Sequence, residues 1–160
     1  MPRQIEITSP SAIAHALIVG SFPPVTQLLP HRGIMLLVDQ VEFYDENVIT
    51  ATYRVPSEPF WAAGHFPPPV GPIMRGVDII EAMAQTAGCH VKLTTGKEAK
   101  SGVLVGVDGA RFSSKVLPGD TLTIMAMHLR GNGRLRVYHA TAMRESKTVA
   151  QSNLKIVLTS

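Results

Sequence analysis

A long apolar segment between residues 77 and 93 restricts the fold more than any other feature of this sequence. Its apolar residues do not alternate as in a strand but recur at helical spacing, at Ile80, Met83, Ala84, Ala87 and Val91. Gly76 precedes the segment as its expected cap, and Asp78 suits the positive end of a helix dipole. The segment is apolar on nearly every face, so it predicts one long helix buried inside a domain.

Segments typical of strands lie on both sides of this helix. Before it, an apolar run from Ile34 to Val41 and the β-branched run 47–55 are joined across "DEN" and predict a hairpin. After it come "VLVGVDGARF", "TLTIMAMHLR", "RLRVYHATAM" and "TVAQSNLKIVL", with a turn signal at Asn132-Gly133. In the last run, apolar or small residues alternate with polar ones. We therefore expect an antiparallel meander after the helix, and an α+β fold in which the sheet curls around one central helix.

The chain of 160 residues fits one domain. We expect residues 1–24, which end at consecutive prolines, to form an extension, and residues 25–160 to form the domain, with a short helical turn before Pro30. The single cysteine, Cys89, leaves neither a disulfide nor a cysteine metal site and favours a reducing compartment. The apolar stretch at 13–20 is too short to span a membrane, so a cytoplasmic protein is expected. A net charge of +3 is too weak to indicate nucleic acid binding.

Glu81 is the one formally charged residue between Asp78 and Lys92. A carboxylate in apolar surroundings requires an ion pair, strong hydrogen bonds or a raised pKa. Glu81 is therefore either catalytic, or a residue that extends to the surface or pairs with an arginine elsewhere. His65 precedes a loop with Pro67, Pro68, Pro69 and Pro72, whose fixed backbone angles give the rigidity that a preorganised acid–base site needs. The same rigidity also suits a purely structural loop.

Four motifs carry a resemblance to a known family. "LLPHRGIMLLVDQV", "GHFP", "PIMRGVDIIEAMAQ" and "VDGARFSSKVLPGDTL" resemble, in the same order, motifs of the FabZ-type 3-hydroxyacyl-[acyl-carrier-protein] dehydratases, over roughly residues 25–125. The resemblance implies the hotdog fold, a central helix wrapped by an antiparallel sheet. It also implies that His65 and Glu81 are the catalytic pair. Gly76 falls on the residue whose amide polarises the thioester carbonyl, with Val77 and Phe66 beside the substrate.

Two departures from the family pattern surround this pair. The "PPPVG" stretch adds two residues to the usual link between His65 and Glu81. Arg75 replaces a proline, and Asp78 replaces an apolar residue. Arg75 becomes the leading candidate for docking an acidic carrier, because added positive charge beside the helix start steers such a partner. These changes, with the N-terminal extension, favour a specialised paralogue.

The chemistry of dehydration suits these residue types. Removal of a C2 proton from a thioester requires a base that is neutral near working pH, and imidazole meets that need. The enolate oxygen needs a donor such as the Gly76 amide, and the leaving 3-hydroxyl needs a proton from Glu81. No metal, nucleotide or other cofactor is demanded.

Three functions remain open from the residues alone. The first is dehydration of (3R)-3-hydroxyacyl groups on acyl carrier protein to trans-2-enoyl groups. The second is thioester hydrolysis by a carboxylate-activated water, and the third is acyl binding without catalysis. For the first, the resemblance implies a homodimer, or a trimer of dimers, in which His65 of one chain faces Glu81 of the other.

Overall fold

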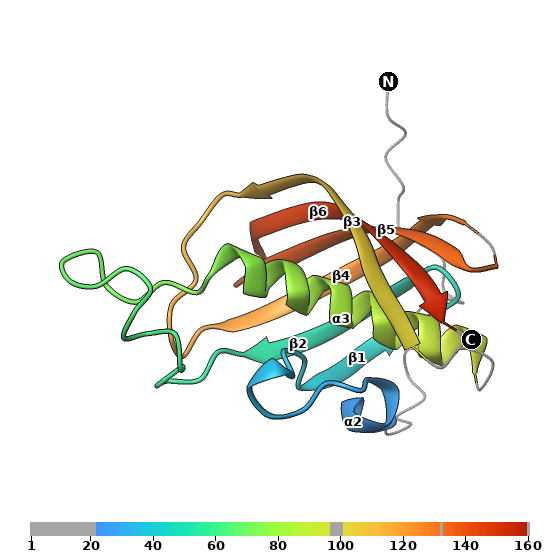
Figure 1. The fold of residues 1–160 in the computed structure, drawn as a ribbon, viewed down its shortest axis with the longest axis horizontal. Helices are drawn as coiled ribbons and strands as arrows, with labels where there is room; N and C mark the ends of the chain where they lie inside the picture. The colour runs from blue at the N-terminus through green and yellow to red at the C-terminus, as the bar shows by residue number, and fades with distance from the viewer. Residues whose placement is uncertain (1–21, 97–100, 132, 160) are drawn as a thin grey trace.

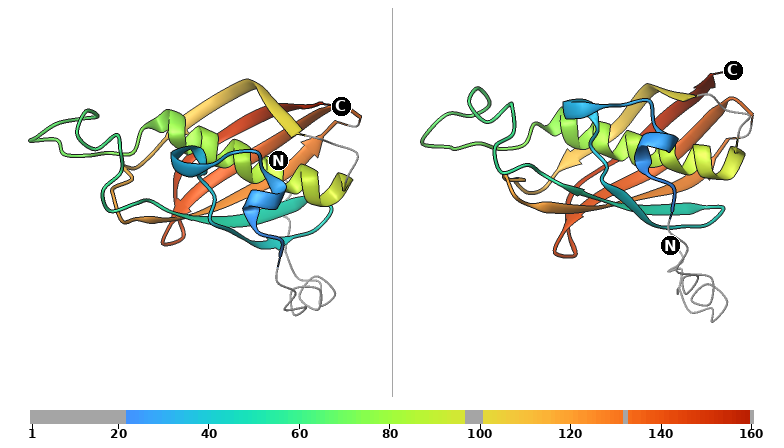
Figure 2. Two further views of the ribbon diagram at one scale, coloured as in Figure 1. Left: turned by 60° about the horizontal axis from the view of Figure 1, so that its bottom comes forward. Right: turned by 90° about the horizontal axis from the view of Figure 1, so that it is seen from below.

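The computed structural model describes residues 22–96, 101–131 and 133–159. Its centre is the 20-residue helix α3 (Gly76–Thr95), which lies across one face of a six-stranded antiparallel sheet (Figure 1). The sheet curls around this helix in both further views (Figure 2). The predicted α+β hotdog architecture is confirmed.

The six strands are arranged in the order β1-β2-β4-β5-β6-β3. Their bounds are β1 (Gln40–Tyr44), β2 (Val48–Arg54), β3 (Ser101–Phe112), β4 (Thr121–Arg130), β5 (Leu135–Arg144) and β6 (Lys147–Thr159). The predicted meander is correct for β4, β5 and β6 but wrong for β3, which pairs with β6 at the far edge while β4 pairs with β2. Alternation along a strand indicates which face is buried, but it carries no information about the neighbouring strand.

The segment before the hairpin differs from its predicted form. A short helix α2 (Val25–Leu28) matches the predicted helical turn. The predicted hairpin is confirmed, because β1 pairs antiparallel with β2, but its first strand begins at Gln40 and not at Ile34, since a 3₁₀ turn η1 (Gly33–Met35) opens this run. Leu37 and Val38 lie in extended chain between η1 and β1, and both are buried. The apolar run therefore indicated a buried segment and not a paired strand.

The core lies between α3 and the concave face of the sheet. Along β6 the residues facing the helix are all buried, as the alternation predicted: Ala150, Ser152, Leu154, Ile156 and Leu158. The helix contributes the fully buried Ala82, Met83 and Ala87. It begins one residue earlier than predicted, so Gly76 is its first residue and Arg75 its cap.

A buried polar pair joins the C-terminal half of α3 to β5. His90 is 1% exposed, and its ring nitrogens lie 2.8 Å from the Tyr138 hydroxyl and 2.9 Å from the Asp45 carbonyl oxygen. A carbonyl only accepts, so Nε2 carries the proton and Nδ1 accepts from Tyr138. Both nitrogens are therefore satisfied by the neutral ring.

Strand β3 is an edge of the sheet and exposes apolar side chains. Val103, Val105 and Val107 are 49%, 56% and 40% exposed, and Phe112 at its end is 51% exposed. Exposed valines on an unpaired strand edge are typical of a surface that pairs with another chain.

Nearly all of the predicted N-terminal extension lies outside the described residues, so its boundary at residue 24 stays a prediction. In the part of the chain that is described, none of the helices combines the length and apolar character needed to cross a membrane.

Candidate active site

His65 is held at the end of a turn in the loop between β2 and α3. Its amide donates to the Trp61 carbonyl at 2.9 Å, and Trp61 is buried beneath the loop. The ring nitrogen Nδ1 lies 2.7 Å from the Ile73 carbonyl oxygen. Because the carbonyl accepts, Nδ1 carries the proton and Nε2 keeps a free lone pair. This is the tautomer that a general base requires.

Phe66 follows in a backbone conformation that is uncommon for a large residue. Its φ is +58°, in the left-handed region, and its ring meets the His65 ring edge to face at 4.6 Å between centroids. The ring contact limits how the imidazole can turn. A strained residue beside a candidate catalytic group is consistent with a functional role for this loop.

The first turn of α3 lies beside His65. His65, Phe66, Gly76 and Phe112 line one hollow together with Lys115. In the described part of the chain, the amides of Gly76 and Val77 donate to no acceptor, as expected at a helix start. A Cβ at Gly76 would lie 2.9 Å from Cζ of Phe112, so a larger residue here would require the Phe112 ring to move. The hollow thus combines a base with the free amide of Gly76.

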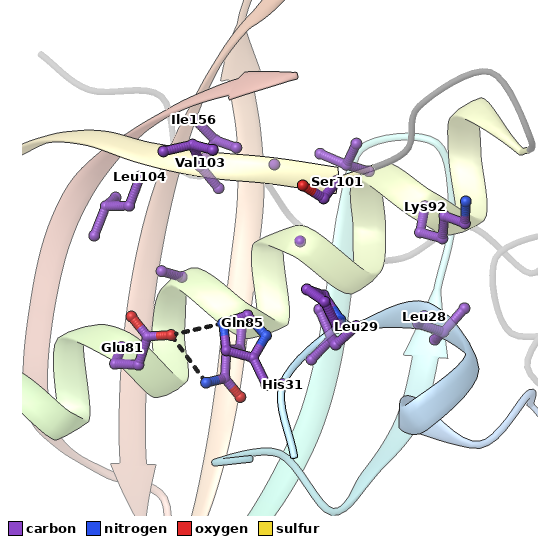
Figure 3. Close-up of a pocket in the computed structure, with 15 residues that line it drawn as sticks. Leu28, Leu29, His31, Glu81, Gln85, Lys92, Ser101, Val103, Leu104 and Ile156 are labelled. Atoms are coloured by element: carbon purple, nitrogen blue, oxygen red, sulfur yellow. Dashed lines mark hydrogen bonds and ion pairs between the residues drawn. The ribbon is translucent and has the colours of Figure 1, made fainter. Parts of the chain in front are cut away.

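Glu81 lies one and a half turns further along α3, in a different hollow (Figure 3). This cavity of about 240 Å³ is bounded by α3, by Leu28 and Leu29 near α2, and by residues 101–104 of β3. The Glu81 side chain is 29% exposed, and its Oε1 lies 3.1 Å from His31 Nε2 and 2.9 Å from Gln85 Nε2. The carboxylate therefore has hydrogen-bonding partners, as its apolar setting demanded.

Arg75 does not line the hollow of His65. Its guanidinium donates to both Asp78 oxygens, at 2.7 and 2.8 Å, and lies over the Phe60 ring. Hydrogen bonding to Asp78 raises the pKa of Arg75 above its ordinary value. The two departures from the family pattern on this helix therefore form one ion pair, in a separate hollow.

The structure thus groups the predicted residues in three places. His65, Phe66 and Gly76 come together, Glu81 lies in the second hollow, and Arg75 lies in the third. Val77 is 69% exposed and lines none of them, so the structure does not place it with the other predicted residues. One chain therefore does not place His65 and Glu81 in the same hollow.

Two other groups bear on the chemistry. Burial raises the pKa of the Cys89 thiol to about 12, so this residue is not a nucleophile at neutral pH. Among residues 22–96, 101–131 and 133–159, no cluster of three or more His, Cys, Asp or Glu could hold a metal ion.

Sequence reasoning missed His31, Gln85, Phe112 and Lys115. Gln85 had a usable signal, because a polar residue four positions after Glu81 in an apolar helix lies on the same face. His31 and Phe112 stand inside quoted motifs, but their positions depend on how α2 and β3 pack against α3. Packing of that kind leaves no local pattern in the sequence.

Comparison with known proteins gives one consistent family. The family described as "ApeP-like: ApeP dehydratase" matches residues 23–160. A 3-hydroxyacyl-[acyl-carrier-protein] dehydratase FabZ of Streptococcus uberis is 39% identical over 138 residues, covering 84% of this chain and 94% of that protein.

Two solved structures share the fold at low sequence identity. The dehydratase heterocomplex ApeI:P from Xenorhabdus doucetiae matches with a TM-score of 0.73 at 20% identity, over 87% of this chain and 93% of that one. A hypothetical thioesterase with coenzyme A from Streptococcus pneumoniae matches with a TM-score of 0.58 at 14% identity, over 75% and 84%. Dehydratases and a thioesterase therefore share this architecture, and the fold alone does not choose between them.

Proposed function

This chain belongs to the ApeP-like dehydratases and is a hydro-lyase of the FabZ type, and from that premise we propose that it converts (3R)-3-hydroxyacyl groups on acyl carrier protein into trans-2-enoyl groups. The resemblance stated from the sequence motifs is confirmed. What remains proposed is the carrier-bound substrate, the stereochemistry, the roles of His65 and Glu81, and the cytoplasmic location that the single cysteine favoured.

The observation that carries the assignment of roles is the position of the two hollows at opposite ends of β3. The Glu81 hollow is bounded by residues 101–104, and the His65 hollow is bounded by Phe112. Two copies paired antiparallel through β3 would set the Ser101 end of one strand beside the Phe112 end of the other. Such a homodimer joins His65 of one chain to Glu81 of its partner, and it covers the exposed valines of β3.

In the joined site His65 acts first. Its Nε2 takes a proton from C2 of the thioester, and the electrons of that C–H bond pass into an enolate whose oxygen accepts from the amides of Gly76 and Val77. The electrons then return to form the C2–C3 double bond as the C3–O bond breaks. Glu81 gives its proton to the departing hydroxyl, which leaves as water. A proton transfer from His65 back to Glu81 restores both groups.

The proposal is tested with 3-hydroxyacyl carrier proteins of graded chain length, followed by intact-mass measurement. Dehydration removes about 18 Da, the mass of one water, while the acyl group stays attached. Release of a free carrier thiol would instead indicate thioester hydrolysis. If neither product forms and C2 takes up no deuterium from solvent, the chain is an acyl-binding protein without catalysis.

Arg75 stays the candidate for carrier docking. Its guanidinium is bonded to Asp78, so docking through it would exchange that partner for an acidic group of the carrier. Arg75→Glu should lower kcat/KM on carrier-bound substrate more than on a short pantetheine thioester, and the difference should shrink as salt increases. An equal loss of kcat/KM on the two substrates would show that Arg75 does not take part in carrier recognition.

A further inference from the structure

His31 touches Glu81 but has no part in the acid–base steps described above. It lies between α2 and η1, and its Nε2 is 3.1 Å from Glu81 Oε1 (Figure 3). Arg32 fixes the backbone at this point, because its guanidinium donates to the carbonyls of Thr26, Leu29 and His31 at 2.7–2.8 Å. The segment between α2 and η1 is thus held in place by its own hydrogen bonds, and it positions the His31 imidazole against α3.

Gln85 approaches the same carboxylate oxygen from the helix. It is 2% exposed, and its Nε2 donates to Glu81 Oε1 at 2.9 Å and to the Met35 carbonyl at 2.7 Å. Its own oxygen accepts from the Leu37 amide at 2.8 Å. The donor and acceptor on the backbone fix which end of the amide faces Glu81. Gln85 therefore cannot turn an oxygen toward the carboxylate without losing two bonds.

The ring proton of His31 can be placed by the same reasoning. Its Nδ1 is buried and has no partner in the described part of the chain. A proton there, on the neutral ring or on the charged one, would leave a buried N–H without an acceptor, whereas the other neutral tautomer places its N–H against the Glu81 oxygen. The favoured form carries its proton on Nε2, as a neutral donor aimed at Glu81.

These contacts distinguish the two oxygens of Glu81. Oε1 accepts two hydrogen bonds, whereas Oε2 has no partner within the described residues. Figure 3 shows the second oxygen turned away from His31 and Gln85, into the space between α3 and β3. An oxygen that already accepts two N–H bonds has little room for a proton of its own. The proton of a neutral Glu81 therefore belongs on Oε2.

We propose that His31 is a positioning residue for Glu81: with Gln85 it occupies Oε1, so that the transferable proton sits on Oε2 and faces the substrate. The proposal rests on the proposed role of Glu81 as the acid. When Oε2 gives its proton to the 3-hydroxyl and the C3–O bond breaks, the new carboxylate charge is met by two donors already in place.

The test compares His31→Phe, which keeps the bulk and removes the donor, with His31→Gln, whose amide nitrogen can take the place of Nε2. His31→Phe should lower kcat about 10- to 100-fold, the scale for a lost hydrogen bond to a charged group, with KM changed less than about threefold. His31→Gln should keep kcat within about threefold of the natural chain. If His31→Phe does not fold, His31→Asn replaces it, because its amide falls short of Glu81.

A second arm repeats His31→Phe in a Glu81→Gln chain. A residue that acts through Glu81 should lose less than about twofold there, because its partner is already gone. His139→Phe serves as the matched control, since His139 is a histidine that bonds Asn153 on the sheet and should leave kcat unchanged.

Three results would overturn the proposal: natural kcat in His31→Phe, an equal loss in both backgrounds, or an equal loss in His31→Gln at an unchanged melting temperature. If instead the natural chain fails to dehydrate any substrate, the proposed function fails and not this inference alone.

Discussion

A single hydrogen bond decides which nitrogen of His65 can act as a base. The Ile73 carbonyl accepts a hydrogen bond from the Nδ1–H group, and Ile73 lies two residues before Arg75, the cap of α3. The loop thereby links the tautomer of His65 to the position of the first turn of α3, where the proposed oxyanion donors lie. A shift in one therefore alters the other.

Loss of either member of the proposed catalytic pair, His65 and Glu81, should abolish most of the activity. His65→Ala and Glu81→Gln should each lower kcat by two orders of magnitude or more, the usual scale for losing an acid or base, with little change in melting temperature. Steady-state kinetics on 3-hydroxyacyl carrier protein would measure this, and thermal melting serves as the fold control. A folded Glu81→Gln chain with near-natural kcat would remove Glu81 from the role of acid.

His90 gives a prediction about stability and pH. Burial lowers its pKa below the ordinary 6.5. As pH falls below about 6.5, the unfolded chain therefore takes up a proton that the folded chain refuses, and the folded state loses up to about 1.4 kcal/mol per pH unit from this residue. The loss continues until the pH reaches the folded pKa.

Urea unfolding at pH 7.5 and 5.5 should show this as a smaller pH dependence in His90→Gln than in the natural chain. His139→Gln, at the residue next to Tyr138 on β5, is the control and should keep the natural pH dependence. Identical pH dependence in His90→Gln and the natural chain would show that His90 does not contribute.

Helices and strands were predictable to different degrees. The long helix and the buried face of β6 were correct, because helical spacing and alternation are local properties of the sequence. The hairpin was correct, but its first strand was placed too early, at Ile34, because a buried extended segment and a paired strand share the same apolar run. The edge position of β3 depends on packing between segments that are distant in the sequence, and so does the contact of His31 with Glu81. Sequence motifs alone do not predict such packing.

The exposed edge of β3 is the expected contact between two copies of the chain. Val105→Lys places a charge on the most exposed valine of that edge and should reduce the association of two chains, measured by sedimentation at micromolar concentration. Leu129→Lys, a substitution of similar exposure at the end of β4, is the matched control. Equal association in both variants would show that β3 is not the contact between copies.

The whole assembly gives the last prediction. If each site takes His65 from one chain and Glu81 from the other, co-refolding equal amounts of the inactive His65→Ala and Glu81→Gln chains should restore activity. Half of randomly paired dimers are mixed, and each mixed dimer has one complete site in two. Recovery should therefore be about a quarter of the natural rate per chain, if sites act independently. No recovery, in a mixture shown by mass to contain mixed dimers, would place the whole site within one chain.

The exposed valine edge of β3 also ties the folding of this protein to its abundance. A chain that has folded but has not yet met a partner presents an open strand, which is a template for unwanted cross-strand association. Pairing of two chains covers the open strand. By mass action, pairing also increases the free energy of unfolding as the protein concentration rises. The melting temperature should therefore climb with protein concentration. A larger fraction of a scarce chain is unpaired, so a scarce chain unfolds more readily than the same chain made in quantity.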